Sequence, residues 1–157
     1  MAEPLIDAIA QRMAKIKTGP GNDASNEMGP LITREHRDRV KSFVDGAADE
    51  GARVVVDGRK DPACGLPGFF LGPTLIDGVK PGMACYDHEI FGPVLSVTRV
   101  KTYEEALKLI NENPFGNGTA IFTRDGGAAQ RYQHDIKVGM VGINVPIPVP
   151  VSYYSFG

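Results

Sequence analysis

The sequence predicts an α/β protein with a mostly parallel sheet flanked by helices. From Arg53 onward, apolar runs typical of strands alternate with helical patterns in the order β, β, β, α, β, α, β. The helices in this series are about ten residues long, and such helices join parallel strands through right-handed crossovers. In sheets of this kind, ligands bind beyond the carboxyl ends of the strands.

Two amphipathic helices are expected before the first strand. Apolar residues at helical spacing predict a helix from Pro4 to Lys17, which the turn Thr18–Gly21 ends. Thr33 has a side chain suited to cap a second helix, and Gly51 is expected to end it. The predicted buried stripe of the second helix consists of Val40, Phe43, Val44 and Ala47.

The remaining elements follow from strand-like runs and from helix-start signals. Strands are predicted at 53–56, 69–76 with a break at Gly72–Pro73, 94–100, 119–123 and 140–145. Thr102 and Glu105 form a capping box, in which each side chain can accept from the other's free backbone N–H, and they begin a helix that runs to Asn111. Asp125 is expected to cap a last helix at 127–135. The residues predicted to face inward from these two helices are Ala106, Leu107, Ile110, Ala128, Tyr132 and Ile136.

The composition is that of one globular domain and argues against several function classes. The chain has 157 residues and a formal net charge of −2, which leaves no basic patch for nucleic acid. It has no apolar run of about 18 residues, so we expect no membrane-spanning helix, and its first residues lack a secretory pattern. The two cysteines do not make a disulfide framework, which favours a reducing environment such as the cytoplasm.

The titratable side chains show no metal-binding or catalytic pattern. The three histidines, His36, His88 and His134, are far apart and have no metal-ligand spacing to the cysteines. Cys64 and Cys85 have neither a helix N-terminus nor a cationic neighbour to activate them, apart from His88 near Cys85. We therefore expect both cysteines to be small buried residues, and we assign no catalytic residue and no metal site.

The segment Glu89–Pro93 is the strongest candidate for a binding loop. It combines a carboxylate, an aromatic ring and a Gly-Pro stop within a few positions, directly before the apolar run that starts at Val94. Binding residues tend to lie on loops held by rigid strands. Glu89 could accept hydrogen bonds from a ribose diol, and Phe91 could pack on a flat ring. The alternative is an ordinary turn with a solvated acid and a phenylalanine that fills the core.

The end of the sequence is rich in proline. Pro146–Pro150 alternates proline with apolar residues and is expected to be extended, because proline cannot occupy an inner strand. This stretch is either a stiff connector or a peptide ligand of the polyproline type. The chain then stops at Ser155–Gly157 in what reads as the middle of a turn. We expect the chain to be incomplete.

At Glu89–Pro93 the sequence resembles the aldehyde dehydrogenase superfamily, and the resemblance extends over nearly the whole chain. Further segments that look like landmarks of that family, in its order, are Met28–Ile32, Gly51–Ala52, Gly72–Leu75, Tyr103–Ala106, Asn117–Thr123 and Ser155–Gly157. The stretch Gly139–Pro150 is more specific, because its proline ladder resembles the CoA-acylating methylmalonate-semialdehyde dehydrogenases.

The resemblance implies an NAD-dependent enzyme that oxidises methylmalonate or malonate semialdehyde through a cysteine thioester and passes the acyl group to coenzyme A. It implies that Glu89 binds the hydroxyls of the nicotinamide ribose and that Phe91 packs near the nicotinamide ring. It also implies that Phe156 lines the aldehyde pocket. By this resemblance the parent protein is a homo-oligomer, located in the cytoplasm or, in a eukaryote, in the mitochondrial matrix.

The resemblance covers only the later part of the family's chain, so residues 1–157 are expected to be the C-terminal part of a catalytic domain. No position matches the family's nucleophilic cysteine, and its cofactor domain is missing. We therefore expect the isolated chain to be inactive and to self-associate. Two alternatives stay open: a non-catalytic α/β module that binds a nucleotide or a partner, and a dehydrogenase for a different aldehyde.

Overall fold

The computed structural model describes residues 2–146, which divide into two compact units with a boundary after Arg99. Phe156 and most of the proline ladder therefore lie outside the described residues. Within residues 2–146, no helix has both the length and the apolar character needed to cross a membrane.

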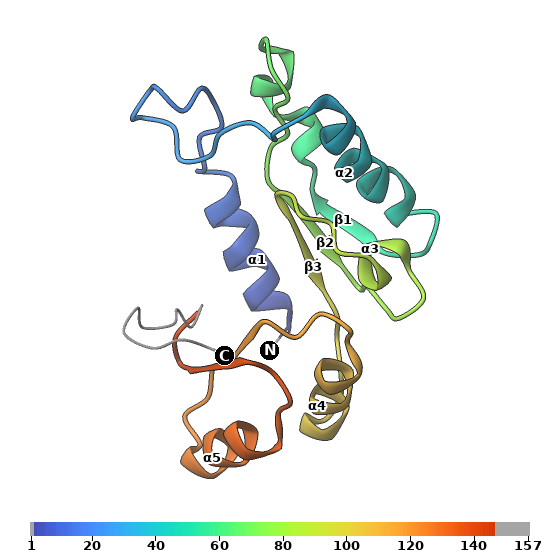
Figure 1. Cartoon of the computed structure of the whole chain (residues 1–157), viewed down its shortest axis with the longest axis vertical. Helices are drawn as coiled ribbons and strands as arrows, with labels where there is room; N and C mark the ends of the chain where they lie inside the picture. The colour runs from blue at the N-terminus through green and yellow to red at the C-terminus, as the bar shows by residue number, and fades with distance from the viewer. Residues whose placement is uncertain (1, 147–157) are drawn as a thin grey trace. The chain divides into compact units, whose positions relative to one another are not determined.

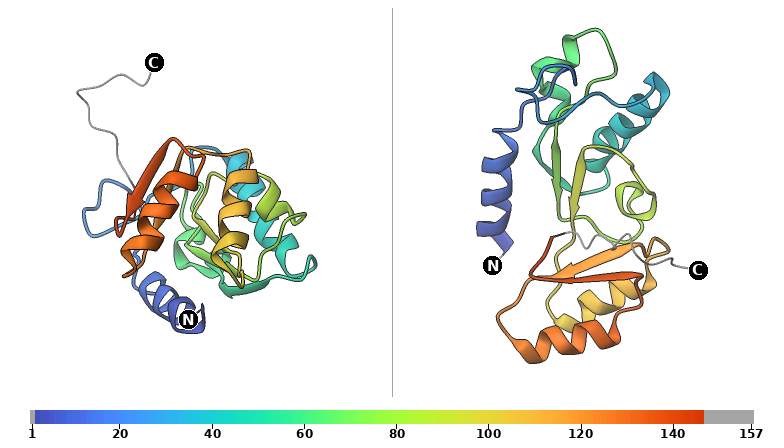
Figure 2. Two further views of the ribbon diagram at one scale, coloured as in Figure 1. Left: turned by 90° about the horizontal axis from the view of Figure 1, so that it is seen from below. Right: turned by 60° about the vertical axis from the view of Figure 1, so that its left-hand side comes forward.

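The first unit is built on a three-stranded sheet with strand order β1-β2-β3. Strand β1 (Arg53–Val56) runs antiparallel to β2 (Thr74–Asp77), and β2 runs parallel to β3 (Val94–Val97). Helix α1 (Ala2–Met13) lies on one face, and α2 (Arg34–Ala47) and the short α3 (Ala84–Asp87) lie on the other (Figures 1 and 2). The unit is therefore a three-layer arrangement with the sheet in the middle.

Helix α2 forms as the sequence predicts. The Thr33 side chain accepts a hydrogen bond from the backbone N–H of His36, which satisfies one of the free donors at the helix start. Gly51 takes a φ of 93°, the left-handed conformation that suits a glycine after a helix end. The predicted stripe is confirmed, since the buried residues of α2 are Val40, Phe43, Val44 and Ala47.

Helix α1 differs from the prediction at both ends. It begins at Ala2 rather than Pro4 and ends at Met13 rather than Lys17. Beyond the helix end, two backbone hydrogen bonds reach back only three residues, from Lys15 N to Arg12 O and from Ile16 N to Met13 O. Only Ile6 is fully buried in this helix, so little packing holds its last predicted turn.

The core of the first unit surrounds β2, whose four residues are all buried. The strand predicted at 69–76 is shorter than expected, because Phe70 and Leu71 are buried without pairing in the sheet. Just before β2, the main chains of Gly72 and Gly58 are in contact, and the Gly72 N–H donates a hydrogen bond to the Gly58 carbonyl at 3.0 Å. A Cβ added to Gly58 would lie 1.9 Å from the Gly72 oxygen. A cluster of core residues joins α2 to this sheet: Phe43, Ala47, Ala52, Ile76, Val79, Met83 and Cys85.

The connection between β1 and β2 contains two short 3₁₀ helices, η1 (Gly58–Lys60) and η2 (Pro62–Gly65). It connects β1 to β2 without a crossover helix, and the two strands run antiparallel. The sheet of this unit is thus mixed, with one antiparallel pair and one parallel pair.

The second unit contains α4 (Tyr103–Glu112), β4 (Gly118–Ile121), α5 (Gly126–Asp135) and β5 (Met140–Ile143). Strands β4 and β5 are parallel, which confirms the predicted strand–helix–strand crossover, and both helices lie on one face of the pair (Figure 2). Strand β4 does not continue the sheet of β3, because the two strands belong to separate sheets. The α/β class with helices flanking the strands holds in each unit.

The caps of the second unit follow the predicted chemistry closely. Thr102 accepts from the Glu105 N–H at 3.2 Å, and Asp125 accepts from the Ala128 N–H at 3.0 Å. The Glu105 carboxylate binds the N–H of Lys101 rather than that of Thr102, so the box closes one residue earlier than predicted. Tyr132 and Ile136 are buried. The other predicted inward residues are only half-buried: Ala106, Leu107, Ile110 and Ala128.

Candidate functional site

The candidate loop, residues 88–93, connects α3 to β3 in the first unit. The His88 N–H donates to the Ala84 carbonyl and ends α3, and the Pro93 carbonyl accepts from Thr74 N in β2 at 2.8 Å. The loop therefore lies at the amino end of β3, where β1 ends but where the parallel pair β2–β3 begins. The loop leads directly into β3, as its position before the apolar run at Val94 predicts.

The side chains of the loop alternate between solvent and core. Glu89 is exposed and Phe91 is 77% exposed, whereas Ile90 between them is half-buried and packs against the core cluster. The alternative interpretation, in which the phenylalanine fills the core, is therefore wrong, because Ile90 takes that place. The loop presents a carboxylate and an aromatic ring outward together.

Helix α2 binds the main chain of this loop through two side chains that sequence reasoning missed. His36 Nε2 lies 2.7 Å from the carbonyl oxygen of Phe91. Arg39 donates from both Nη1 and Nη2 to the carbonyl oxygen of Glu89, each at 3.2 Å. These contacts fix the Glu89–Ile90 and Phe91–Gly92 peptide groups.

Phe91 adopts a φ of 54°, which lies in the left-handed region. Such a conformation is uncommon for a residue other than glycine and costs of the order of 1 kcal/mol or more. The next residue, Gly92, touches α2 directly, because a Cβ there would lie 2.7 Å from both methyl carbons of Val40. The local path of the loop is therefore set by α2 and not by the preferences of its own residues.

The carboxylate of Glu89 makes no hydrogen bond or ion pair with any residue in the described range 2–146. Arg39 binds the main-chain carbonyl of the same residue and leaves the carboxylate open. Two carboxylate oxygens can accept hydrogen bonds from two neighbouring hydroxyls. The exposed ring of Phe91, two residues on, can pack against a flat group beside such a diol.

The two cysteines lie in different short helical turns of the first unit. Cys85 lies in the first turn of α3, so the expectation that neither cysteine is near a helix start is wrong for this residue. Burial nevertheless raises the pKa of the Cys85 thiol, and the nearby Glu50 carboxylate raises it further. Cys64 is half-buried in η2, with its Sγ 3.4 Å from the Gly58 carbonyl oxygen. Within residues 2–146, no group of three His, Cys, Asp or Glu side chains could hold a metal.

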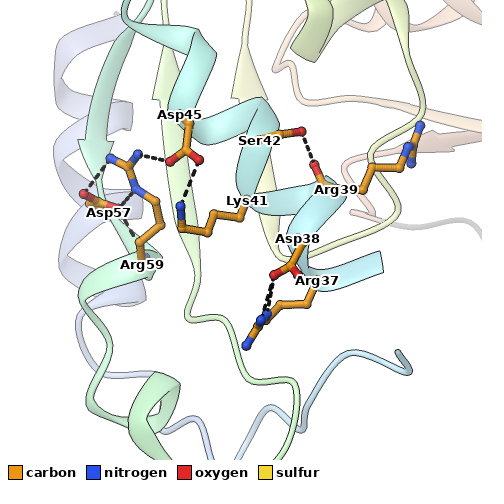
Figure 3. Close-up of polar contacts among 8 residues, drawn as sticks. All are labelled: Arg37, Asp38, Arg39, Lys41, Ser42, Asp45, Asp57 and Arg59. Atoms are coloured by element: carbon orange, nitrogen blue, oxygen red, sulfur yellow. Dashed lines mark hydrogen bonds and ion pairs between the residues drawn. The ribbon is translucent and has the colours of Figure 1, made fainter. Parts of the chain in front are cut away.

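A concave region of about 400 Å³ lies beside α2. Its lining consists of Arg37, Asp38, Lys41, Asp45, Arg59, Cys64, Phe70 and Leu71. Figure 3 shows that the charged groups here bind one another, with Arg39 directed away from them on the other side of α2.

The ion pairs of this region connect α2 to the end of β1. Asp45 accepts from Lys41 at 2.9 Å and from Arg59 at 2.6 Å, and Arg59 also makes two bonds to the Asp57 carboxylate (Figure 3). The Lys41 and Arg59 hydrogen bonds lower the pKa of Asp45, and the Arg59 hydrogen bonds lower that of Asp57. Carboxylates held ionised in this way are structural braces rather than proton donors.

Comparison with known proteins gives the family of this chain. The model described as the aldehyde dehydrogenase family matches residues 1–157. A malonate-semialdehyde dehydrogenase of Pseudomonas aeruginosa is 49% identical over 100% of this chain and 32% of its own length. An acylating, mitochondrial methylmalonate-semialdehyde/malonate-semialdehyde dehydrogenase of Bos taurus is 46% identical over 99% of this chain and 29% of its own length.

A crystal structure from Sinorhizobium meliloti 1021, assigned as a methylmalonate-semialdehyde dehydrogenase and complexed with NAD, is 48% identical. It superposes with a TM-score of 0.94 over 99% of this chain and 32% of that one. The chain thus spans about a third of the length of the relatives it matches. Because the family match covers every residue, the chain belongs to the aldehyde dehydrogenase family.

Proposed function

We propose that this chain supplies the nicotinamide-ribose site of an NAD-dependent, CoA-acylating dehydrogenase of methylmalonate or malonate semialdehyde. The observation that carries the proposal is the open Glu89 carboxylate next to the exposed Phe91 ring, on a loop held by α2. The names of the relatives support the substrate class, and the NAD complex of one of them supports the cofactor. Coenzyme A as acyl acceptor is supported by the word acylating in the name of the bovine relative.

The residues of the loop fit this role chemically. The two oxygens of Glu89 accept hydrogen bonds from the two hydroxyls of the ribose and fix its orientation. The ring of Phe91 packs beside the nicotinamide and limits its movement. NAD, when bound, supplies the hydride acceptor for oxidation of the aldehyde. Phe156 is proposed to line the aldehyde pocket, at a position outside the described residues.

The thioester step requires an activated thiolate, and we propose that it comes from outside residues 2–146. Burial and the raised thiol pKa of Cys85 support this for that residue. We propose that residues 1–157 form the C-terminal part of a catalytic domain. The coverage of about a third of each relative supports the part played by length alone, namely that the chain corresponds to a portion of such a protein. The parent protein is proposed to be a homo-oligomer of the cytoplasm or, in a eukaryote, of the mitochondrial matrix. The word mitochondrial in the name of the bovine relative supports the organelle alone.

A titration of the isotope-labelled chain with NAD, followed by NMR, tests the cofactor site. We expect NAD to shift the amide signals of residues 88–93. Glu89→Gln should weaken binding about tenfold, because the amide loses the charge and one acceptor oxygen. Glu112→Gln is the matched control, since Glu112 is an exposed acid in the second unit. Shifts that are absent from the loop, or equal in Glu89→Gln and the unaltered chain, would refute the proposal.

The isolated chain should form no NADH from malonate semialdehyde, NAD and coenzyme A. The assay is the absorbance of NADH, with an intact dehydrogenase of the family as positive control. A rate above background that survives replacement of both Cys64 and Cys85 by serine would contradict the assignment of the nucleophile to another part of the parent protein.

A further inference from the structure

We propose that His36 and Arg39 of α2 are positioning residues that hold Glu89 and Phe91 in the orientation that binds the cofactor. This inference rests on the proposed function of the loop. Neither side chain is placed against the cofactor itself, because both bind main-chain carbonyls of the loop. Their effect on the cofactor is therefore expected to be indirect.

The two side chains lie on one face of α2. His36 and Arg39 are three residues apart, which puts them on the same side of α2 one turn after the other. The backbone N–H of His36 is fixed by the cap Thr33. A capped and packed helix start is a rigid base from which to hold a loop.

Phe91 is the strained residue of the loop. A φ of 54° at Phe91 is retained only if neighbouring contacts compensate its cost. The carbonyl of Phe91 is bound by His36 Nε2 at 2.7 Å, and the two rings meet edge to face at 6.4 Å between centroids. His36 thus contacts both the peptide group and the ring of the residue whose conformation is least favourable.

Arg39 is oriented by an aromatic ring of its own helix. Its guanidinium carbon lies 5.0 Å from the centre of the Phe43 ring, in a cation–π arrangement. This contact within α2 orients the guanidinium independently of the loop. From there two nitrogens reach the single carbonyl oxygen of Glu89. The guanidinium therefore binds a main-chain oxygen, and the Glu89 carboxylate stays available for a ligand.

Loss of either contact should reduce the share of molecules with a correctly shaped loop. The apparent affinity for a ligand falls in proportion to the population of the binding-competent state. Removing His36 or Arg39 should therefore weaken NAD binding although neither residue touches NAD. The contacts of the sheet with α1 should remain as they are.

Four variants and two reporter amides test this inference in the full chain. The variants are His36→Ala, His36→Gln, Arg39→Ala and Arg39→Lys, with Arg37→Ala as a control that removes a charge from the same helix without a loop contact. The reporters are the Val94 amide, which donates to the Gly92 carbonyl within the loop, and the Val79 amide, which donates to the Val97 carbonyl away from it. Hydrogen exchange at both amides and the NAD titration are measured by NMR.

We expect His36→Ala and Arg39→Ala to speed exchange at Val94 about tenfold and to weaken NAD binding by a similar factor, with Val79 unchanged. His36→Gln should restore both values, because its amide N–H can donate to the same carbonyl. Arg39→Lys should restore them only in part, since lysine has no second nitrogen, and Arg37→Ala should behave as the unaltered chain.

Unchanged exchange and unchanged NAD affinity in both alanine variants would overturn the inference. Equal acceleration at Val94 and Val79 would also overturn it, because that result means a general loss of stability. If the unaltered chain shows no NAD-induced shifts, the proposed function fails and the inference fails with it. If the unaltered chain binds NAD and the alanine variants bind equally well, only the inference fails.

Discussion

Arg99 binds the carboxylate of Asp77 through two nitrogens, with Nε 2.9 Å from Oδ1 and Nη2 2.7 Å from Oδ2. Asp77 ends β2 and its side chain is only 5% exposed. Arg53 of β1 donates to the same carboxylate at 2.8 Å, and both arginines also reach Glu3 of α1. One buried carboxylate therefore ties the sheet to the helix on one of its faces.

Asp77→Asn should destabilise the first unit by about 2 kcal/mol, because three charge-assisted hydrogen bonds lose their ionised acceptor. The measurement is urea unfolding followed by circular dichroism. Asp49→Asn is the control, since Asp49 is exposed near the end of α2. A loss no larger than that of the control would mean that the arginines contribute little.

The same carboxylate predicts a pH dependence of stability. The hydrogen bond from Arg99 lowers the pKa of Asp77 below its ordinary value of 3.8, and the bond from Arg53 lowers it further against the opposing effect of burial. A depressed pKa means that the unfolded chain binds the proton first, so this stabilisation is present above about pH 4 and is lost as the pH falls through the folded value. Thermal unfolding between pH 6 and about pH 3 should show a smaller loss for Asp77→Asn than for the unaltered chain. Parallel curves for the two proteins would contradict this prediction.

Gly92→Ala should cost about 2 kcal/mol, because the new Cβ would lie 2.7 Å from both methyl carbons of the buried Val40. Gly46→Ala is a matched control within α2, where a Cβ meets no atom within 4 Å, and it should be neutral or stabilising. In a double-mutant cycle, Val40→Ala should relieve part of the cost of Gly92→Ala. Strict additivity of the two changes would show that the contact is not the cause.

Alkylation by iodoacetamide at neutral pH should modify Cys64 before Cys85. Cys85 is buried and its thiol has a raised pKa, whereas Cys64 is half-buried. Mass spectrometry of peptides sampled over time distinguishes the two sites, and Cys64→Ser leaves Cys85 as the only thiol. Fast modification of Cys85 in the folded chain would contradict the assignment of an unactivated thiol.

Self-association of the isolated chain remains a prediction. Large apolar side chains are exposed in each unit, including Ile32 and Phe91 in the first and Phe122, at 66% exposed, in the second. Light scattering should give an apparent mass that rises with concentration, and Phe122→Ser should reduce the rise. A constant monomer mass at every concentration would show the prediction to be wrong.

Local chemistry made the helix starts predictable from sequence. Thr33, Thr102 and Asp125 each bind a backbone N–H three residues later, and that signal depends only on neighbouring residues. The strands were predictable in place but not in length or partner. Phe70 and Leu71 carry the apolar signal of a strand and yet are buried without pairing, since burial and pairing leave the same mark on a sequence.

The candidate loop was predictable as a segment, but its support was not. His36 lies 55 residues from Phe91 and Arg39 lies 50 residues from Glu89, so no local pattern connects them. The left-handed conformation of Phe91 was also hidden, because positive φ is expected at glycine, asparagine or aspartate. The roles of Glu89, Phe91 and Phe156 toward cofactor and substrate stay predictions.

The main-chain contact between Gly58 and Gly72 limits how this protein can change over time. A side chain at Gly58 would collide with the Gly72 oxygen, and one at Gly72 would lie 2.5 Å from the Cβ of Asp61. At Gly58 the obstacle is main chain, so no change of a neighbouring side chain can make room. At Gly72 the obstacle is the side chain of Asp61, so a substitution there first requires a change at Asp61. The two glycines therefore differ in how freely evolution can replace them.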